Sequence, residues 1–527
     1  MKRRQFIKQA ATTSIGLSTS INGFGLRALA ALPFLKPTDN LTDTDHVLVL
    51  INLAGGNDGI NTVIPFDQYN KLTSARPYVL LNENELLSLN GYDATKLHPK
   101  MQGMQQLFNE GKMQIIQSVG YPNPDFSHFR STDIWMSASD SDQVVNTGWV
   151  GRYLNYEYPN FPVDYPNVNM PHPLSIEFSS SPSLALQSPT SNMAFTINDP
   201  EYIYNLASGS QQPAPNTPAG EQLTHIRIVA QQSRQYSQVV ANIYNNTTAL
   251  SDNLDTALAE QLRITARLIK GGLKTRIYLL HLDGFDTHAS QVESSNHSEG
   301  THAFLLQTLS DAVAAFQQHL TTLGIAQRVT TMTFSEFGRR IISNFSLGTD
   351  HGTAAPLFII GENVQGGILG SNPFIPNNTS VDDNIPMQYD FRSVYNTLLK
   401  DWFCVPEQDL PISMLQNFPT LPIFNSGTSC ISSSVHDYNV KGGTVLVRPY
   451  PNPFVTSISI EFLSLGGFTT VQIFNTHGRN IRTLAQGNFP QGTHTVTFDS
   501  EDLPAGIYYV RLQNLSLQQV KPIIKAR

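Results

Sequence analysis

Apolar runs and helix-like segments alternate along most of this chain, between residues 40 and 430. From Leu305 to Leu323, apolar residues recur at steps of three and four, which is the period of an amphipathic helix. Gly324 ends that segment, and the apolar run Val329–Phe334 after it predicts a strand. This alternation favours βαβ units. We therefore predict an α/β domain over residues 40–430, built on a mostly parallel sheet flanked by helices.

The amino-acid composition of the chain changes within this domain and again at the end of the domain. Pro, Ser, Asn and Tyr dominate residues 155–220, which predicts an irregular insertion or cap over the sheet edge. Residues 223–273 are predicted to form one or two long helices. A Ser- and Gly-rich stretch begins at Ser426, and within it we predict a linker at residues 431–443.

The last part of the chain, residues 444–527, has a different period. Short runs alternate apolar and polar residues, and turn signals such as Leu503-Pro504-Ala505-Gly506 separate them. This pattern predicts a small all-β sandwich, whose clearest strands are residues 457–462, 470–474, 493–498 and 507–512.

The composition of the chain is typical of a protein that functions outside the cytoplasm. Only 14% of the residues are charged, and the formal net charge is −8. A chain with this charge lacks the excess of positive charge that is typical of nucleic-acid-binding proteins. Its two cysteines, Cys404 and Cys430, could form one structural disulfide in an oxidising compartment, and their spacing fits no zinc ribbon.

The N-terminus is predicted to be a targeting signal rather than part of the folded domain. Lys2-Arg3-Arg4-Gln5-Phe6-Ile7-Lys8 has the pattern of a twin-arginine signal, and a mildly apolar stretch follows it. That stretch is too polar for a permanent membrane helix. With Ala28-Leu29-Ala30 as a cleavage site, we predict a signal peptide over residues 1–30 and no transmembrane segment in the mature protein. Such a signal implies export in the folded state.

Five short polar clusters, each beside an apolar run, contain the candidate chemistry. In an open α/β sheet, ligands bind in the crevice outside the carboxyl ends of the strands. Carboxylates, imidazoles and a hydroxyl that meet there could form a metal site with a nucleophile beside it. The clusters are Gly55-Gly56-Asn57-Asp58-Gly59, Asp125-Phe126-Ser127-His128-Phe129, Gly284-Phe285-Asp286-Thr287-His288, Ser335-Glu336-Phe337-Gly338-Arg339 and Thr349-Asp350-His351-Gly352.

The first two clusters each admit two interpretations. Asp58, in a Gly-rich turn, is either a metal ligand or an ordinary turn residue. Ser127 is either a nucleophile or a helix N-cap. A helix N-terminus also suits an anion, and His128 or Arg130 could bind that anion or activate the hydroxyl.

The last three clusters supply further candidate ligands. Asp286 and His288 are two residues apart, so in extended chain they point to one side. Glu336 is a metal ligand, a general base, or the partner of Arg339 in an ion pair, while Arg339 could clamp an oxyanion. The adjacent pair Asp350-His351 suits metal ligation, with an exposed loop as the alternative.

Together these clusters resemble the family called DUF1501. The resemblance extends from about residue 47 to residue 405 and includes Asn52–Asn61 with Pro65, Leu97-His98-Pro99 and Val119-Gly120-Tyr121-Pro122, besides motifs in the other four clusters above. That family has no settled activity, and its fold resembles the alkaline phosphatase and sulfatase superfamily. The resemblance implies an alkaline-phosphatase-like α/β fold for this chain.

The superfamily resemblance also implies roles for single residues. Asp58 stands where members carry an Asp after the first strand, and Ser127 stands where a nucleophile opens a helix. Asp286 with His288 matches an Asp…His pair, and His351 matches a final histidine before a late strand. Ser335-Glu336 stands where the superfamily carries an Asp-His pair. The resemblance therefore implies one metal, or none, rather than two.

The C-terminal sandwich resembles the type A C-terminal sorting domain of the Bacteroidetes type IX secretion system. The matching residues are Pro451-Asn452-Pro453-Phe454, Val471-Gln472-Ile473-Phe474-Asn475, Gly506-Ile507-Tyr508 and the basic tail, residues 521–525. This resemblance implies transit through the periplasm and across the outer membrane. It places the protein at the cell surface or outside the cell, with the twin-arginine and type IX machineries as partners. An Ig-like binding module is the alternative.

Our hypothesis is an exported hydrolase of phosphate or sulfate esters in which Ser127 attacks and Arg339 or Arg130 binds the ester oxygens. A divalent metal (zinc, manganese or calcium) would assist. The alternative is a secreted, non-catalytic binding or assembly protein with a degenerate metal site; a third is a surface protein that binds glycans. The predicted metal ligands, or a subset of them, are Asp58, Asp286, His288, Glu336, Asp350 and His351.

Overall fold

The computed structural model describes residues 44–425, apart from 160, 164, 168–169, 198–217 and 249, and residues 445–526, apart from 451, 453, 465–466, 476–479, 491, 501–502 and 515–517. The chain divides into two compact units, Met1–Ile431 and Ser432–Arg527. The predicted signal peptide, the predicted linker and Cys430 lie outside the described residues, whereas Cys404 is disulfide-bonded.

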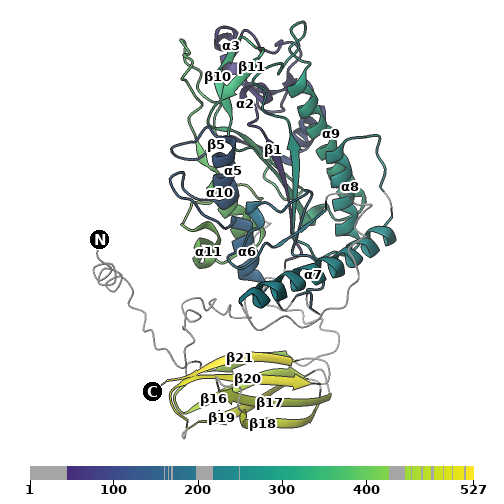
Figure 1. The fold of residues 1–527 in the computed structure, drawn as a ribbon, viewed down its shortest axis with the longest axis vertical. Coiled ribbons are helices and arrows are strands. Elements are labelled where there is room, and N and C mark those ends of the chain that lie inside the picture. Colours follow the sequence, from purple (N-terminus) through teal and green to yellow (C-terminus); the bar gives the residue numbers. More distant parts are fainter. Residues whose placement is uncertain are drawn as a thin grey trace, which may run out of the picture. The chain divides into compact units, whose positions relative to one another are not determined.

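A nine-stranded sheet forms the centre of the first unit (Figure 1). Strand β12 (Ala355–Ile360) is the exception to its parallel arrangement, because it runs antiparallel to both of its neighbours. The predicted α/β class with a mostly parallel sheet is confirmed. In spatial order the strands are β13 (Gly367–Leu369), β5 (Met113–Gly120), β12 (Ala355–Ile360), β9 (Val329–Phe334), β1 (Val47–Ala54), β8 (Ile277–Asp283), β6 (Ser175–Glu177) and β7 (Ala194–Thr196), and β14 (Tyr389–Asp390) also pairs with β5.

Helices cover both faces of this sheet, as Figure 1 shows. The strands are consequently buried on both sides, and β1 reads as an almost unbroken apolar run. The helices α4 (Gln102–Asn109), α8 (Ala257–Lys270) and α9 (Thr301–Thr322) pack together over one face; α5 (His128–Ser137), α6 (Trp149–Glu157), α10 (Phe391–Thr397) and α11 (Leu410–Met414) lie over the other.

Several segments differ from the pattern expected from the sequence. The long helical stretch forms two helices, α7 (Pro218–Asn246) and α8. The segment predicted to be irregular contributes β6 and β7 to the sheet edge. An antiparallel hairpin, β10 (Arg339–Asn344) with β11 (Gly348–His351), occupies a region that we expected to be loop. The remaining elements near it are α2 (Gly59–Thr62), α3 (Tyr69–Ala75) and the three-stranded sheet of β2 (Val63–Pro65), β4 (Thr95–Leu97) and β3 (Leu87–Ser88).

The second unit is an all-β structure of two antiparallel sheets, as the sequence predicted. Alternate side chains of its strands, such as Ile458, Ile460 and Phe462 of β16, are buried in a core between them. The strands β18 and β21 complete a sheet that the sequence pattern showed only in part. One sheet has the order β15 (Val445–Tyr450), β16 (Ser457–Ser464), β19 (Gly492–Asp499), and the other β18 (Asn480–Phe489), β17 (Gly467–Asn475), β20 (Gly506–Asn514), β21 (Gln518–Lys525).

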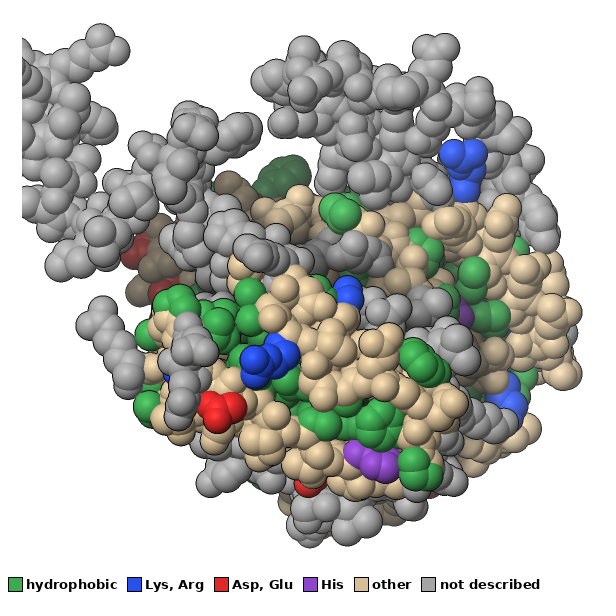
Figure 2. All heavy atoms as spheres, turned by 90° about the horizontal axis from the view of Figure 1, so that it is seen from below, with side chains coloured by type: hydrophobic (Ala, Val, Ile, Leu, Met, Phe, Trp, Pro, Cys, Tyr) green, Lys and Arg blue, Asp and Glu red, His purple; other side chains and the backbone are tan. Residues whose placement is uncertain are grey.

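Surface charge is sparse. On the face drawn in Figure 2, the coloured Lys and Arg side chains lie apart from one another and form no basic patch. Among the described residues, no helix combines the length and the apolar character that crossing a membrane requires.

Candidate metal centre

The direction of β12 brings the predicted clusters together. Strands β1, β8, β9 and β5 all end at one edge of the sheet, because they run parallel. Strand β12 runs the other way, so it begins at that same edge. His351, four residues before β12, therefore meets residues that follow the other strands. This edge is where an open α/β sheet binds its ligands.

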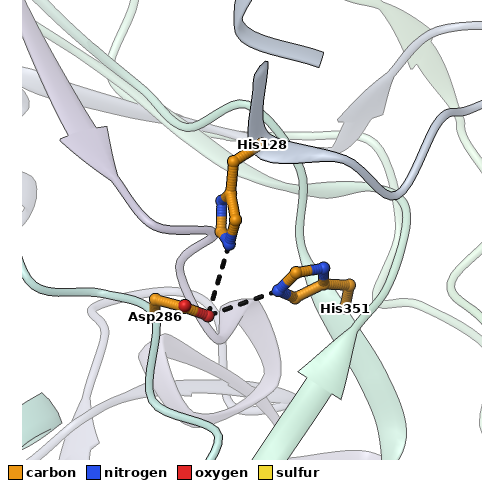
Figure 3. A group of neighbouring side chains, drawn as sticks. All are labelled: His128, Asp286 and His351. Carbon is orange, nitrogen blue, oxygen red and sulfur yellow. Dashed lines mark hydrogen bonds and ion pairs between the residues drawn. The ribbon is translucent and has the colours of Figure 1, made fainter. Parts of the chain in front are cut away.

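The carboxylate of Asp286 is the centre of the arrangement (Figure 3). Its Oδ1 atom lies 3.4 Å from Nε2 of His128, 3.2 Å from Nε2 of His288 and 3.3 Å from Nε2 of His351. The potential ligand atoms of His128, Asp286 and His351 all lie within 4.8 Å of one another. Three imidazoles from three separate segments thus face one carboxylate oxygen.

The opposite nitrogen of each imidazole is held by an acceptor. Nδ1 of His128 lies 2.8 Å from Oε1 of Glu336, and Nδ1 of His288 lies 3.1 Å from Oδ1 of Asp350. Nδ1 of His351 lies 2.7 Å from the carbonyl oxygen of Phe126. An acceptor at Nδ1 selects the tautomer that carries its proton there, which leaves a lone pair on Nε2. Metal-binding histidines are oriented in this way, by a carboxylate or a carbonyl behind the ring.

These tautomers turn four acceptors toward one another. Nε2 of His288 and Nε2 of His351 are 2.8 Å apart, and Nε2 of His128 is buried without a hydrogen-bond partner. Lone pairs this close repel unless a positive charge lies among them. A divalent cation, or an extra proton on one imidazole, would satisfy the arrangement. The donor set therefore fits a metal ion.

Asp286 is ionised at neutral pH. Burial raises the pKa of its carboxyl, but the hydrogen bond and positive charge of Arg339, together with the neighbouring imidazoles, lower that pKa to about 2. Its side chain is still 49% exposed, so the carboxylate can be reached from solvent. Burial lowers the pKa of His351, against the opposing effect of its hydrogen bond to Phe126. An ionised carboxylate beside imidazoles is a suitable set of ligands.

The chemistry of the donors narrows the choice of metal. Imidazole nitrogen suits zinc and other transition metals, whereas calcium takes six to eight oxygen ligands. A set of two or three imidazoles with one carboxylate therefore fits zinc or manganese better than calcium.

Two family models match the chain. The model described as a protein of unknown function (DUF1501) matches residues 117–383, just over half of the chain. This chain belongs to the DUF1501 family. A second model, for a secretion system C-terminal sorting domain, matches residues 448–526 of the DUF1501 protein. Both resemblances stated from the sequence are thereby confirmed. No curated protein matches the chain.

Solved structures similar to this DUF1501 protein include sulfatases and a member of the alkaline phosphatase superfamily. An alkaline phosphatase superfamily protein from Vibrio parahaemolyticus is 9% identical (TM-score 0.32), with 91% of this chain and 82% of that chain covered. PsFucS1 sulfatase from Pseudoalteromonas sp. is 10% identical (TM-score 0.33), with 86% and 83% covered. A sulfatase from a Bacteroides thetaiotaomicron locus for glycosaminoglycan metabolism is 7% identical (TM-score 0.35), with 84% and 89% covered.

The predicted ligands of the DUF1501 protein take different positions around the centre. Asp286, His288 and His351 lie together, with their potential ligand atoms facing one another. Glu336 and Asp350 lie behind the histidines and orient them. Glu336 is nearly fully buried, and its Oε1 also accepts a hydrogen bond of 2.9 Å from the backbone N–H of Gly55.

Asp58 belongs to a separate, fully buried ion pair. Its Oδ2 accepts from the guanidinium of Arg76 and, at 2.6 Å, from the side-chain amide of Gln291. Its Oδ1 accepts from the backbone N–H of Asn61 and caps α2. Both oxygens of this carboxylate are therefore engaged away from Asp286, which matches the turn interpretation of Asp58 more closely than the ligand interpretation.

The two neighbouring arginines of β10 point to opposite sides of that strand. Arg339 is buried and donates to the carbonyl oxygens of Gly56 (2.6 Å) and Thr349 (2.8 Å) and to Oδ1 of Asp286 (2.7 Å). It holds the loop at Gly56, strand β11 and the carboxylate in place. Arg340 is 25% exposed, and its Nε donates to the carbonyl oxygen of His351 at 3.3 Å. Of the two, Arg340 is the one that solvent can reach.

Ser127 occupies the N-cap position of α5 beside His128, and its side chain makes no capping hydrogen bond. The residue is exposed, and its backbone N–H donates to Oδ1 of Asp125 at 2.7 Å. The guanidinium of Arg130 is engaged by the carbonyl oxygens of Asp140, Ser141 and Gln143. An accessible serine therefore directly precedes His128 in the chain, while Arg130 stabilises a neighbouring loop.

His128 was not among the ligands predicted from the sequence. The Ser127-His128-Phe129 motif already indicated a functional site. From the sequence, however, Ser127 was the candidate nucleophile, and His128 was expected only to bind the anion or activate the hydroxyl. The structure shows that the imidazole, at the first residue of α5, reaches Asp286.

Proposed function

We propose that this DUF1501 protein is an exported, metal-dependent hydrolase of phosphate or sulfate esters. One observation carries the proposal: Nε2 of His128, His288 and His351 converge on the ionised Asp286 while every Nδ1 is held from behind. A centre of this kind at the carboxyl edge of an α/β sheet, open to solvent, suits chemistry on an anionic ester.

In this proposal His128, Asp286 and His351 hold the cation, and His288 is a fourth donor beside them. A bound divalent cation would polarise the ester oxygens and neutralise the charge that builds up on them. Glu336 fixes the ring of His128 from behind. Arg339 holds the carboxylate of Asp286 from the buried side, so it acts as a positioning residue.

Ser127 is the proposed nucleophile. This exposed residue directly precedes His128, and the N-terminus of α5, which no side chain caps, favours a negatively charged group there. Attack by the hydroxyl forms a bond from Oγ to phosphorus or sulfur while the bond to the alcohol oxygen breaks, and the proton lost from Oγ ends on the departing alcohol. Water then hydrolyses the serine ester. Arg340, the accessible arginine, is proposed to bind the ester oxygens in place of Arg339.

The sorting domain indicates secretion to the cell surface or the extracellular medium. We propose that the twin-arginine signal at residues 1–30 first exports the folded chain to the periplasm. Folding before export would let the protein acquire its metal inside the cell. The type IX machinery would then take the chain across the outer membrane, with residues 444–527 as the sorting domain.

The test begins with metal analysis of the mature protein by inductively coupled plasma mass spectrometry. We expect about one equivalent of zinc or manganese, which His351→Ala removes. The loaded protein is then assayed with 4-nitrophenyl phosphate and 4-nitrophenyl sulfate. Turnover of one ester that Ser127→Ala abolishes, with unchanged circular dichroism and metal content, supports the hydrolase. Full turnover by Ser127→Ala contradicts the nucleophile assignment.

The ion pair of Asp58 with Arg76 favours a second candidate. It removes a carboxylate that the superfamily resemblance would assign to a metal. A secreted binding or assembly protein that retained the fold would show this change. Such a protein would bind metal or none, and would hydrolyse neither ester.

A further inference from the structure

A cavity of about 290 Å³ lies beside the proposed metal centre. Its walls are residues 120–124, Thr353, Ala354 and residues 384–387. The first wall leads to Phe126, whose carbonyl oxygen lies 2.7 Å from Nδ1 of His351. The second wall begins two residues after His351. Since two residues span at most about 7 Å, the backbone of this wall begins within about 7 Å of that of His351.

The cavity is preformed, because hydrogen bonds hold its walls together. Oγ1 of Thr353 donates to the carbonyl oxygen of Ile385 at 2.5 Å. The hydroxyl of Tyr121 is engaged by Ser131 at 2.8 Å and accepts from the backbone N–H of Asp125 at 3.0 Å. Arg340 donates to the carbonyl oxygen of Val381 and to Asp382 at 3.2 Å, which ties the last wall to β10. Ligand pockets are usually formed before binding in this way.

The lining is uncharged and mainly apolar. None of its eleven residues is acidic or basic. Because the hydroxyl of Tyr121 is already hydrogen-bonded, this residue offers its apolar ring to a ligand. Pro122 and Pro124, in the same wall, have no backbone N–H to donate. Ile385 and Met387 complete the apolar wall, and two asparagine amides add hydrogen-bonding groups. An anion is therefore not the occupant that this lining selects.

Arg340 lies between this cavity and the centre. It donates to the backbone of His351 on one side and to the loop before residue 384 on the other, and it is partly exposed. The ring of Phe126, 41% exposed, lies 6.0 Å from its guanidinium. A ligand that spans the two sites would place a negative group at the centre and beside Arg340, and an uncharged group in the cavity.

From this division of charge we infer that the cavity is the subsite for the alcohol part of the ester, and that it selects an uncharged ring about the size of a phenyl group. The inference rests on the proposed function, since it names the substrate class of the same centre. It predicts a preference for esters of ring alcohols over esters of methanol.

The experiment compares two variants of the metal-loaded, full mature chain. Met387→Trp fills the cavity from a residue that is 37% exposed, and Ile412→Trp is a matched control on α11, at 41% exposure outside the cavity lining. For whichever ester class turns over, KM is measured for the 4-nitrophenyl and the methyl ester. We expect Met387→Trp to raise KM for the 4-nitrophenyl ester about tenfold and to change KM for the methyl ester less than twofold. Equal effects on both esters, or the same effect from Ile412→Trp, would overturn the inference.

Binding of 4-nitrophenol, measured by saturation-transfer nuclear magnetic resonance in mildly acidic buffer where the phenol is uncharged, separates this inference from the proposed function. The probe carries no ester and needs no turnover. Binding to the parent protein and to Ile412→Trp, lost in Met387→Trp, supports the subsite even if neither ester is hydrolysed. No binding of 4-nitrophenol to the parent protein would overturn the subsite even if both esters are hydrolysed.

Discussion

Nδ1 of His128 lies 2.8 Å from Oε1 of Glu336, although 208 residues separate them in the chain. Glu336 is buried and also accepts from the backbone N–H of Gly55, so its oxygen is fixed on two sides. This relationship explains the unusual Ser335-Glu336 pair without making Glu336 a ligand. The glutamate determines where the imidazole points, and the imidazole faces Asp286.

Replacement of this orienting carboxylate should weaken metal binding without removing a ligand. Since partners behind a metal-binding histidine typically contribute tenfold to hundredfold in affinity, we expect Glu336→Gln to lower zinc affinity about 10- to 100-fold. Competition with a chromophoric chelator measures this. Glu260→Gln, on the half-exposed surface of α8, is the control and should leave the affinity unchanged. An unchanged affinity in Glu336→Gln would show that His128 needs no orientation or binds no metal.

Removal of the imidazole of His128 should have a larger effect. His128→Ala deletes one of the three ligands that lie within 4.8 Å of one another, so we expect metal content to fall below about a tenth of an equivalent after dialysis. His281→Ala is a matched control, because that histidine pairs with Glu177 at 3.1 Å instead. Metal analysis of the two variants side by side gives the answer. Full metal content in His128→Ala would contradict the proposed ligand set.

The buried pair of Asp58 and Arg76 should contribute to stability rather than to metal binding. Asp58→Asn leaves the guanidinium of Arg76 buried without its counter-charge, and a broken buried pair typically costs about 3–5 kcal/mol of unfolding free energy. Urea unfolding of the metal-free protein measures the loss. The folded fraction of the variant should still bind one equivalent of metal. If Asp58→Asn has normal stability but no longer binds metal, Asp58 is a metal ligand instead.

Stability should fall with acid because of a buried histidine beneath the loops. Burial lowers the pKa of His302 to about 4, against about 6.5 in the unfolded chain, and its Nε2 lies 2.9 Å from Oδ1 of Asn57. Between these two values the unfolded chain binds more protons than the folded one. The contribution of neutral His302 to the free energy of unfolding is therefore fully present above pH 6.5. It is lost as the pH falls toward 4, by up to about 3 kcal/mol.

Unfolding of the metal-free protein in urea at several pH values between 4 and 7 tests this expectation. His302→Gln keeps an amide that can donate to Asn57 but cannot titrate, so its stability should depend less steeply on pH. If the parent protein and His302→Gln show the same slope, the acid sensitivity arises elsewhere. His98, next to His302, is a second contributor, because burial lowers its pKa well below the usual value.

The elements of this protein could be predicted because their signals are local. The apolar run Val329–Phe334 forms β9 with the bounds that its sequence predicts, and the periodic segment before it forms α9. The polar clusters lie at the sheet edge because each directly follows or precedes such a strand. Asp286, His288 and His351 could thus be named as candidates from residue type and position alone. The hairpin of β10 and β11 was missed, since its mostly polar residues resemble a loop.

The roles of those candidates depended on contacts that no local pattern contains. Asp58 pairs with Arg76, Glu336 stands behind His128, and Arg339 is buried while Arg340 is exposed. A sequence motif shows which groups follow a strand. It does not show which way each side chain turns, or which distant residue neutralises it. That choice is made by packing between segments tens to hundreds of residues apart, because burying a charge requires a partner that only the folded chain can supply.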